Sequence, residues 1–280
     1  MNRPTRRPAS APTPPSRSRL LACALTAGVL WSATACAGYE GSGNVNAQAS
    51  ASPAVIASPT ATPSLTDAQA TAALITQAEL GGPWSETRGG ATWRDGVLKS
   101  RTDDPDCQRL LDGLYAEDLL GEPKGPRAVV GLDESDGEAQ MRYQVAAYAG
   151  PGDVDAKLAW LRTLPSTCGE FMSTDVRGGQ AYVTVVPAKL PGVGDAREGL
   201  RMTMSSAVDS DDEDSGEGWT LTLDFAAVRV GDRAVSLTNG GLGGAAEDST
   251  QQAVQIGTQR LQDILAGKPP TEAPTTTEQD

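Results

Sequence analysis

Histidine is missing from this sequence, and aromatic residues are few. None of the 280 residues is histidine, and aromatic side chains make up 4% of the chain. The absence of histidine excludes Ser-His-Asp and Cys-His catalytic mechanisms, and also zinc sites built from three histidines. Paired carboxylates or a Ser-Lys pair stay open as catalytic groups. The chain has 36 acidic residues, so some carboxylates lie near one another by chance, and their proximity alone does not indicate catalysis. We expect no enzymatic activity, no cofactor and no metal site.

The N-terminal region has no hydrophobic run long enough for a membrane span. Its apolar stretch, residues 20–31, is too short to cross about 30 Å of hydrocarbon as a helix. It follows residues 1–19, which contain five arginines and no acid, and it precedes small residues. A basic segment, a short apolar segment and then small residues are typical of a secretory signal peptide. We therefore expect residues 1–35 to be removed on export.

Cysteine is also scarce, and Cys36 has a particular setting. It follows Ala33-Thr34-Ala35, a pattern that resembles the lipobox of bacterial lipoproteins, in which the cysteine thiol carries a diacylglycerol. Ala33 stands where such boxes usually have a large aliphatic residue. An ordinary signal peptide cut near Ala35 or Ala37 is therefore the alternative, and it leaves Cys36 free or in a disulfide. We expect a lipid on Cys36 that anchors the protein to the extracytoplasmic face of the cell membrane.

Two segments have too little apolar content to fold. Residues 37–64 consist almost entirely of Ala, Ser, Pro, Thr, Gly and Asn, and residues 268–280 are rich in Pro, Thr and acids. Such segments do not bury enough apolar surface to offset the entropy lost on ordering. We predict a disordered tether over residues 36–64, which starts at the lipidated Cys36, and a disordered tail over residues 268–280. A single folded domain would then span residues 65–267.

Positive charge is scarce in the mature chain. The full chain has 23 basic and 36 acidic residues and a net charge of −13. Removal of residues 1–35 leaves 18 basic residues, the same 36 acidic residues and a net charge of −18. This charge repels nucleic acid and anionic lipid headgroups. It argues against a nucleic-acid partner and against a domain that lies flat on the bilayer.

Two cysteines remain for the folded domain. Of the four in the chain, Cys23 lies in the signal peptide and Cys36 is the lipidation candidate. Cys107 and Cys168 form the one remaining pair in an oxidising compartment, so we predict a disulfide between them. The alternative is two buried free thiols.

Hydrophobic periodicity predicts an α+β domain. Helical patterns cover residues 64–80, 102–114, 153–164 and 245–267. Alternating or apolar strand patterns cover residues 127–132, 141–149, 180–190, 199–208, 218–230 and 233–239, and a further strand is expected after Cys168. Runs of strands separated by few helices favour one antiparallel sheet. We predict a single domain with about six or seven strands and with helices packed on one face of the sheet.

Three stretches are candidates for a binding site. Trp84 and Trp93 lie in a Gly-rich stretch, where they either line a ligand groove or cap the core. The acidic run 209–218 lacks EF-hand spacing and is expected to be a solvated hairpin loop, which leaves cation binding open. The Gly-rich segment 239–248 lacks the lysine of a phosphate-binding loop and is expected to be a connection. The two tryptophans are therefore the candidate ligand contacts.

The order of these segments resembles a known family. The segment LITQAEL, residues 74–80, with a tryptophan after it, is similar to a helix that opens many actinobacterial sensor-type lipoprotein domains. Over residues 65–266 the chain resembles the extracellular sensor domain of mycobacterial serine/threonine kinase type H and its free lipoprotein relatives. The resemblance implies an extracytoplasmic α+β domain that binds a ligand. That family usually has two disulfides and this domain can form one, so no ligand-binding residue is carried over.

The sequence therefore predicts a lipid-anchored, cell-surface ligand-binding or sensor module without enzymatic activity. Its expected partners are the membrane, through the lipid anchor, and an unknown small ligand or envelope protein. The alternative is a structural or interaction protein of the cell envelope that binds another protein.

Overall fold

A computed structural model describes residues 64–82, 84–90, 93–134, 139–207 and 218–269. The predicted signal peptide and Cys36 lie outside the described residues. So do residues 37–63 of the tether, 209–217 of the acidic run and 270–280 of the tail. Within the described part of the chain, no helix has the length and apolar character needed to cross a membrane.

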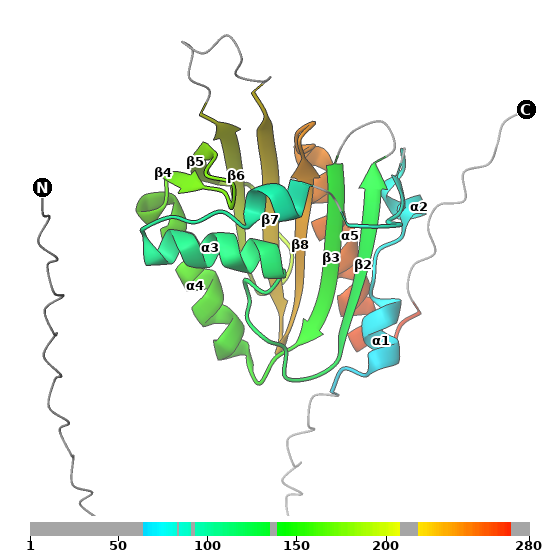
Figure 1. Cartoon of the computed structure of the whole chain (residues 1–280). Helices are drawn as coiled ribbons and strands as arrows, with labels where there is room; N and C mark the ends of the chain where they lie inside the picture. The colour runs from blue at the N-terminus through cyan, green and yellow to red at the C-terminus, as the bar shows by residue number, and fades with distance from the viewer. Residues whose placement is uncertain (1–63, 83, 91–92, 135–138, 208–217, 270–280) are drawn as a thin grey trace, which may run out of the picture. The chain divides into compact units, whose positions relative to one another are not determined.

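A single antiparallel sheet of eight strands organises the described residues (Figure 1). Its strand order is β1-β2-β3-β8-β7-β6-β5-β4. The strands are β1 Trp84–Glu86, β2 Arg127–Glu134, β3 Ala139–Ala147, β4 Glu170–Thr174, β5 Gln180–Pro187, β6 Ala196–Ser206, β7 Thr220–Val230 and β8 Arg233–Gly241. The α+β class and the antiparallel sheet are confirmed. β1 was not predicted, because three residues are too few to show a period of two.

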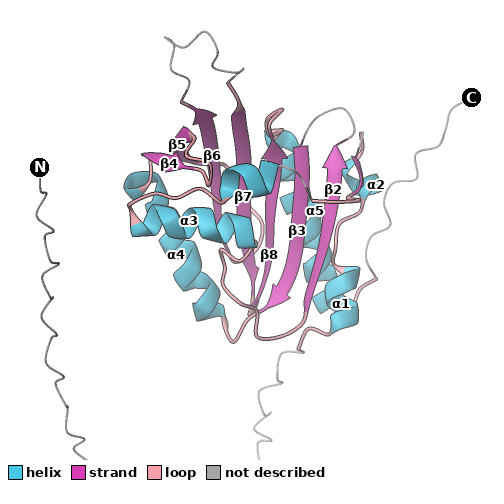
Figure 2. Cartoon of the chain, in the orientation of Figure 1, coloured by secondary structure: helices cyan, strands magenta, loops and turns pink. Residues whose placement is uncertain are grey.

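Helices flank the sheet (Figure 2). They are α1 Asp67–Ala72, α2 Gln77–Leu80, α3 Pro105–Ala116, α4 Pro151–Thr167 and α5 Glu247–Leu265, with a π-helical turn η1 at Arg94–Leu98. The single helix predicted over residues 64–80 is in fact two. Thr66 and Gln69 form one capping box, and Thr76 and Glu79 form a second, so a new helix begins at Gln77.

A disulfide joins α3 to α4. Asp104 caps α3 by accepting hydrogen bonds from the amides of Asp106 and Cys107, and Pro105 occupies the first turn. Cys168 follows directly after the last residue of α4. Cys107 and Cys168 are bonded to each other with their Cα atoms 5.5 Å apart, which is the pairing expected from the sequence.

The sheet has a hydrophobic core on each face. One core contains side chains of α3 and α4 packed on β5, β6 and β7. The other contains side chains of α1, α2 and α5 packed on β2, β3, β7 and β8. Helices therefore cover both faces, and the expectation of one covered face is corrected. The reason is that β7 is apolar on both sides, because Leu223 and Phe225 enter the first core and Ala226 and Val228 enter the second.

A buried ion pair fastens α5 to its face of the sheet. The Asp224 side chain, 1% exposed, accepts hydrogen bonds from Nε and Nη2 of Arg201 at 2.7 and 2.9 Å. The Thr250 hydroxyl of α5 donates to the same carboxylate at 2.9 Å. Alternation alone assigns Asp224 to a polar face, but α5 covers that face at this point and makes the carboxylate part of the interior.

The two helical layers cover different halves of the sheet. In Figure 1, α3 and α4 lie in front of one half, and α5 lies behind the other. On the α5 side, the outer strands β4 and β5 are left uncovered, and Tyr182 is 62% exposed there. On the α3 side, β2 and β3 are covered only in part. The candidate site lies on this second open region.

Removal of the disulfide should destabilise the domain. The chain-entropy model gives a loss of about 4 kcal/mol in unfolding free energy for a loop of this size, whose ends are 61 residues apart in sequence. The double variant Cys107→Ser, Cys168→Ser should therefore unfold at a lower denaturant concentration than the oxidised wild type. Added reductant should destabilise the wild type and leave the variant unchanged. Equal unfolding midpoints for the variant and the oxidised wild type would contradict a stabilising disulfide.

Candidate functional site

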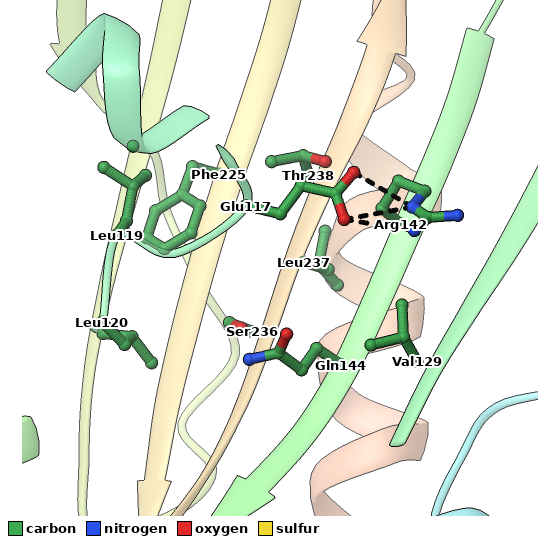
Figure 3. Close-up of a pocket in the computed structure, with 11 residues that line it drawn as sticks. Glu117, Leu119, Leu120, Val129, Arg142, Gln144, Phe225, Ser236, Leu237 and Thr238 are labelled. Atoms are coloured by element: carbon green, nitrogen blue, oxygen red, sulfur yellow. Dashed lines mark hydrogen bonds and ion pairs between the residues drawn. The ribbon is translucent and has the colours of Figure 1, made fainter. Parts of the chain in front are cut away.

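A small cleft of mixed polarity lies on the partly open face of β2, β3 and β8, beside the loop that follows α3 (Figure 3). Its polar lining consists of Glu117, Arg142, Gln144, Ser236 and Thr238. Its apolar lining includes Leu119, Leu120, Val129, Phe225 and Leu237. The cavity has a volume of about 20 Å³, which is room for one water-sized group.

Strand register brings the polar side chains together. Arg142 of β3 stands directly opposite Thr238 of β8, and Gln144 stands opposite Ser236. Directly paired residues of neighbouring strands point to the same face of a sheet and lie within contact distance. On the other side of β3, Val129 of β2 pairs with Gln144 and borders the cleft. The floor of the cleft is therefore formed by side chains of the sheet, which is the rigid part of the domain.

Glu117 enters the cleft from the end of α3. It is the C-cap residue of that helix and adopts φ 59° and ψ 35°, a left-handed conformation that costs an ordinary residue on the order of 1 kcal/mol. Among the described residues it is the one non-glycine residue with a positive φ. Its carboxylate accepts hydrogen bonds from Nε and Nη2 of Arg142 at 3.0 and 3.2 Å. These bonds hold the residue in its strained conformation.

A second arginine shares the same carboxylate. Nη2 of Arg94 lies 3.0 Å from Oε1 of Glu117 and also donates to the Leu114 carbonyl at 3.0 Å. The Arg94 side chain is 11% exposed. Burial lowers the pKa of the Arg94 guanidinium and the charge on Arg142 lowers it further, while Glu117 opposes both effects. Two cations therefore share one carboxylate at the edge of the cleft.

The cleft also contains an unpartnered hydroxyl group. Thr238 is 6% exposed, and its Oγ1 atom has no hydrogen-bond partner among the described residues. A buried hydroxyl without a partner is costly. Thr238 and Glu117 both line the cleft (Figure 3). Because the Glu117 carboxylate is already engaged by two arginines, the arrangement favours binding of a polar group over general acid-base catalysis.

A larger groove lies on the other side of the same loop. It has a volume of about 470 Å³ and runs between α3 and α4. The Arg109 guanidinium stacks on the Trp160 ring there, 4.0 Å from the ring centroid. Leu119 borders both spaces and packs on Gly113 of α3, where an added Cβ would lie 2.5 Å from the leucine Cδ2. Leu119 thus separates the small cleft from the groove.

The structure does not bring Trp84 and Trp93 together. Trp84 is 8% exposed and belongs to the core beneath α5, whereas Trp93 is 7% exposed and belongs to the core beneath α3 and α4. Neither residue lines the cleft or the groove. Both are core residues, and they belong to the cores on opposite faces of the sheet. Their burial fits the alternative in which they cap the core, and ligand contact by either residue stays a prediction.

The remaining candidates have simple outcomes. Cys36 lies outside the described residues. Cys107 and Cys168 lie near Asp104, and this trio is the cluster of potential metal ligands within the described ranges. Their sulfur atoms are bonded to each other and are not thiolate ligands.

Sequence reasoning missed Glu117, Arg142 and Thr238. Arg142 lies on the polar side of the predicted strand 141–149. A strand face exposed to solvent shows the same polar pattern, so the pattern does not single out Arg142. Glu117 is one acid among many at the end of a helix. No local pattern joins the two, because they are 25 residues apart and meet only through the packing of α3 on the sheet.

Replacement of Glu117 by glutamine should destabilise the domain. The substitution keeps the size of the side chain and leaves Arg94 and Arg142 without a carboxylate, so the free energy of unfolding should fall by about 1–3 kcal/mol. Glu122→Gln is the matched control, because Glu122 pairs with Lys124 on the surface and such pairs contribute little. Chemical denaturation measures both. Equal effects of the two substitutions would show that the Glu117 cluster has no structural role.

No protein-family model and no curated protein sequence matches this chain. Among solved structures, it is similar to the crystal structure of the extracellular domain of PknH from Mycobacterium tuberculosis, with 13% sequence identity and a TM-score of 0.43. The likeness covers 74% of this chain and 100% of the PknH chain. It is a weak likeness of fold to the kind of sensor domain that the sequence resembles.

Proposed function

We propose that this protein is a non-enzymatic ligand-binding or sensor module, held at the extracytoplasmic face of the cell membrane by a lipid on Cys36. Its binding site is the cleft bordered by Glu117, Arg142 and Thr238. The observation that carries the proposal is this cleft. It presents a buried hydroxyl without a partner, an excess of guanidinium charge and an apolar wall on the open part of a rigid sheet.

The location rests on separate observations. The lipobox-like sequence before Cys36 and the tether after it supply an anchor and a spacer. The disulfide between Cys107 and Cys168 suits an oxidising compartment. A negatively charged domain at the end of a spacer stays away from anionic headgroups and leaves its cleft free to meet a ligand in the envelope.

Native mass spectrometry of the full chain, purified without reductant from the envelope of its own host, tests the binding function. We expect a reproducible small adduct on the wild-type protein, because the cleft is built to hold a polar ligand. The adduct should be weakened in a Thr238→Val variant, which keeps the side-chain shape and removes the hydroxyl. An adduct-free mass together with one dominant protein in crosslinking would instead support the alternative of an envelope interaction protein.

Substitution of Cys36 tests the anchor. A Cys36→Ala variant should move from the membrane fraction to the soluble fraction, because the thiol that carries the lipid is gone. Cys23→Ala is the matched control, since Cys23 lies in the segment expected to be removed, and this variant should stay with the membrane. Fractionation followed by immunoblotting measures both. Unchanged membrane retention of Cys36→Ala would refute lipidation at this residue.

A further inference from the structure

We propose that the ligand of this cleft carries a carboxylate on an apolar body, and that the carboxylate binds the free edge of the Arg142 guanidinium. This inference rests on the proposed function and names the chemical class of its ligand.

Arg142 has a hydrogen-bonding edge that the protein leaves open. A guanidinium offers two edges for bidentate binding of a carboxylate. Glu117 occupies the edge formed by Nε and Nη2. The other edge is formed by Nη1 and the second hydrogen of Nη2. Nη1 has no hydrogen-bond partner among the described residues, and the Arg142 side chain is 34% exposed. A carboxylate from solution can therefore reach this edge without displacing Glu117.

Gly131 allows Arg142 and Thr87 to pack closely against β2. It lies in β2 directly opposite Arg142. A Cβ atom at this position would lie 3.0 Å from Nη1 of Arg142 and 2.8 Å from Oγ1 of Thr87. Glycine thus lets the Arg142 guanidinium and the Thr87 side chain lie directly against the strand. Asp133, the next carboxylate on this face of β2, accepts hydrogen bonds from Thr87 and Gln140, both at 2.8 Å.

The local charge favours an anion. Arg94 and Arg142 share the single carboxylate of Glu117, so the cluster has one positive charge in excess. This excess stands within a chain whose net charge is −13. A second carboxylate would complete a balanced set of two cations and two anions. Because part of the cluster is removed from solvent, the interaction is screened less than one on the open surface.

The walls of the cleft favour an apolar body on the same ligand. Val129 of β2 borders the cleft on one side. Leu119, Leu120 and Phe225 form the opposite wall. The Thr238 hydroxyl and the Gln144 amide offer polar contacts at the floor. An enclosed volume of about 20 Å³ admits only the tip of such a ligand, so most of the ligand lies along the open face of β2 and β3.

Ligand-observed NMR on the full chain in detergent tests this proposal. The probes are benzoate and hexanoate, each compared with its uncharged amide. We expect the carboxylates to bind at least about tenfold more tightly than the amides, because only they form a charge-assisted bidentate pair. Arg142→Gln should abolish this preference. Arg142→Lys, which keeps a positive charge beside Glu117 but has no edge for bidentate binding, should weaken carboxylate binding, and Arg177→Gln on the exposed β4–β5 turn should leave it unchanged.

The outcomes separate the ligand class from the function. Equal binding of the amides and carboxylates, with loss in Thr238→Val, would overturn the carboxylate proposal and keep the cleft as a binding site. Carboxylate binding that survives both Arg142→Gln and Arg142→Lys would also overturn it. If neither carboxylate binds, the carboxylate proposal fails, and the native adduct on the wild-type chain decides separately whether the binding function stands.

Discussion

Burial of the central strands on both faces is the constraint on which the rest of this structure depends. Successive side chains of a strand point to opposite faces, so β7 supplies Leu223 and Phe225 to one core and Ala226 and Val228 to the other. Each face then needs its own helical layer. Because the layers cover different halves of the sheet, each leaves a part of its face open, and the cleft beside Arg142 lies on one of these parts.

The disulfide and the Glu117 cluster complete the frame around the cleft. The bond between Cys107 and Cys168 holds the start of α3 to the end of α4. At the other end of α3, Glu117 is held in a left-handed conformation by ion pairs with Arg94 and Arg142. The helix is thereby fastened at both ends, one covalently and one by charge. The loop that carries Leu119 is consequently positioned between the small cleft and the groove of α3 and α4.

Much of the architecture was predictable because it depends on local pattern. A strand pattern over residues 218–230 marked β7, a helical pattern over residues 102–114 marked α3, and elimination among four cysteines paired Cys107 with Cys168. The errors arose where a signal was short or ambiguous. The two capping boxes that split the first helix lie within one continuous helical pattern, and the three residues of β1 show no period.

The sequence by itself determined the α+β class, most strands, the cysteine pairing and the absence of histidine chemistry, since composition and period are local properties of the chain. Only the tertiary structure decided that helices cover both faces, that Trp84 and Trp93 belong to separate cores, and that Glu117 meets Arg142. These facts depend on which strands become neighbours and on which half of each face a helix covers. Such contacts join residues far apart in the chain, and no local period specifies them.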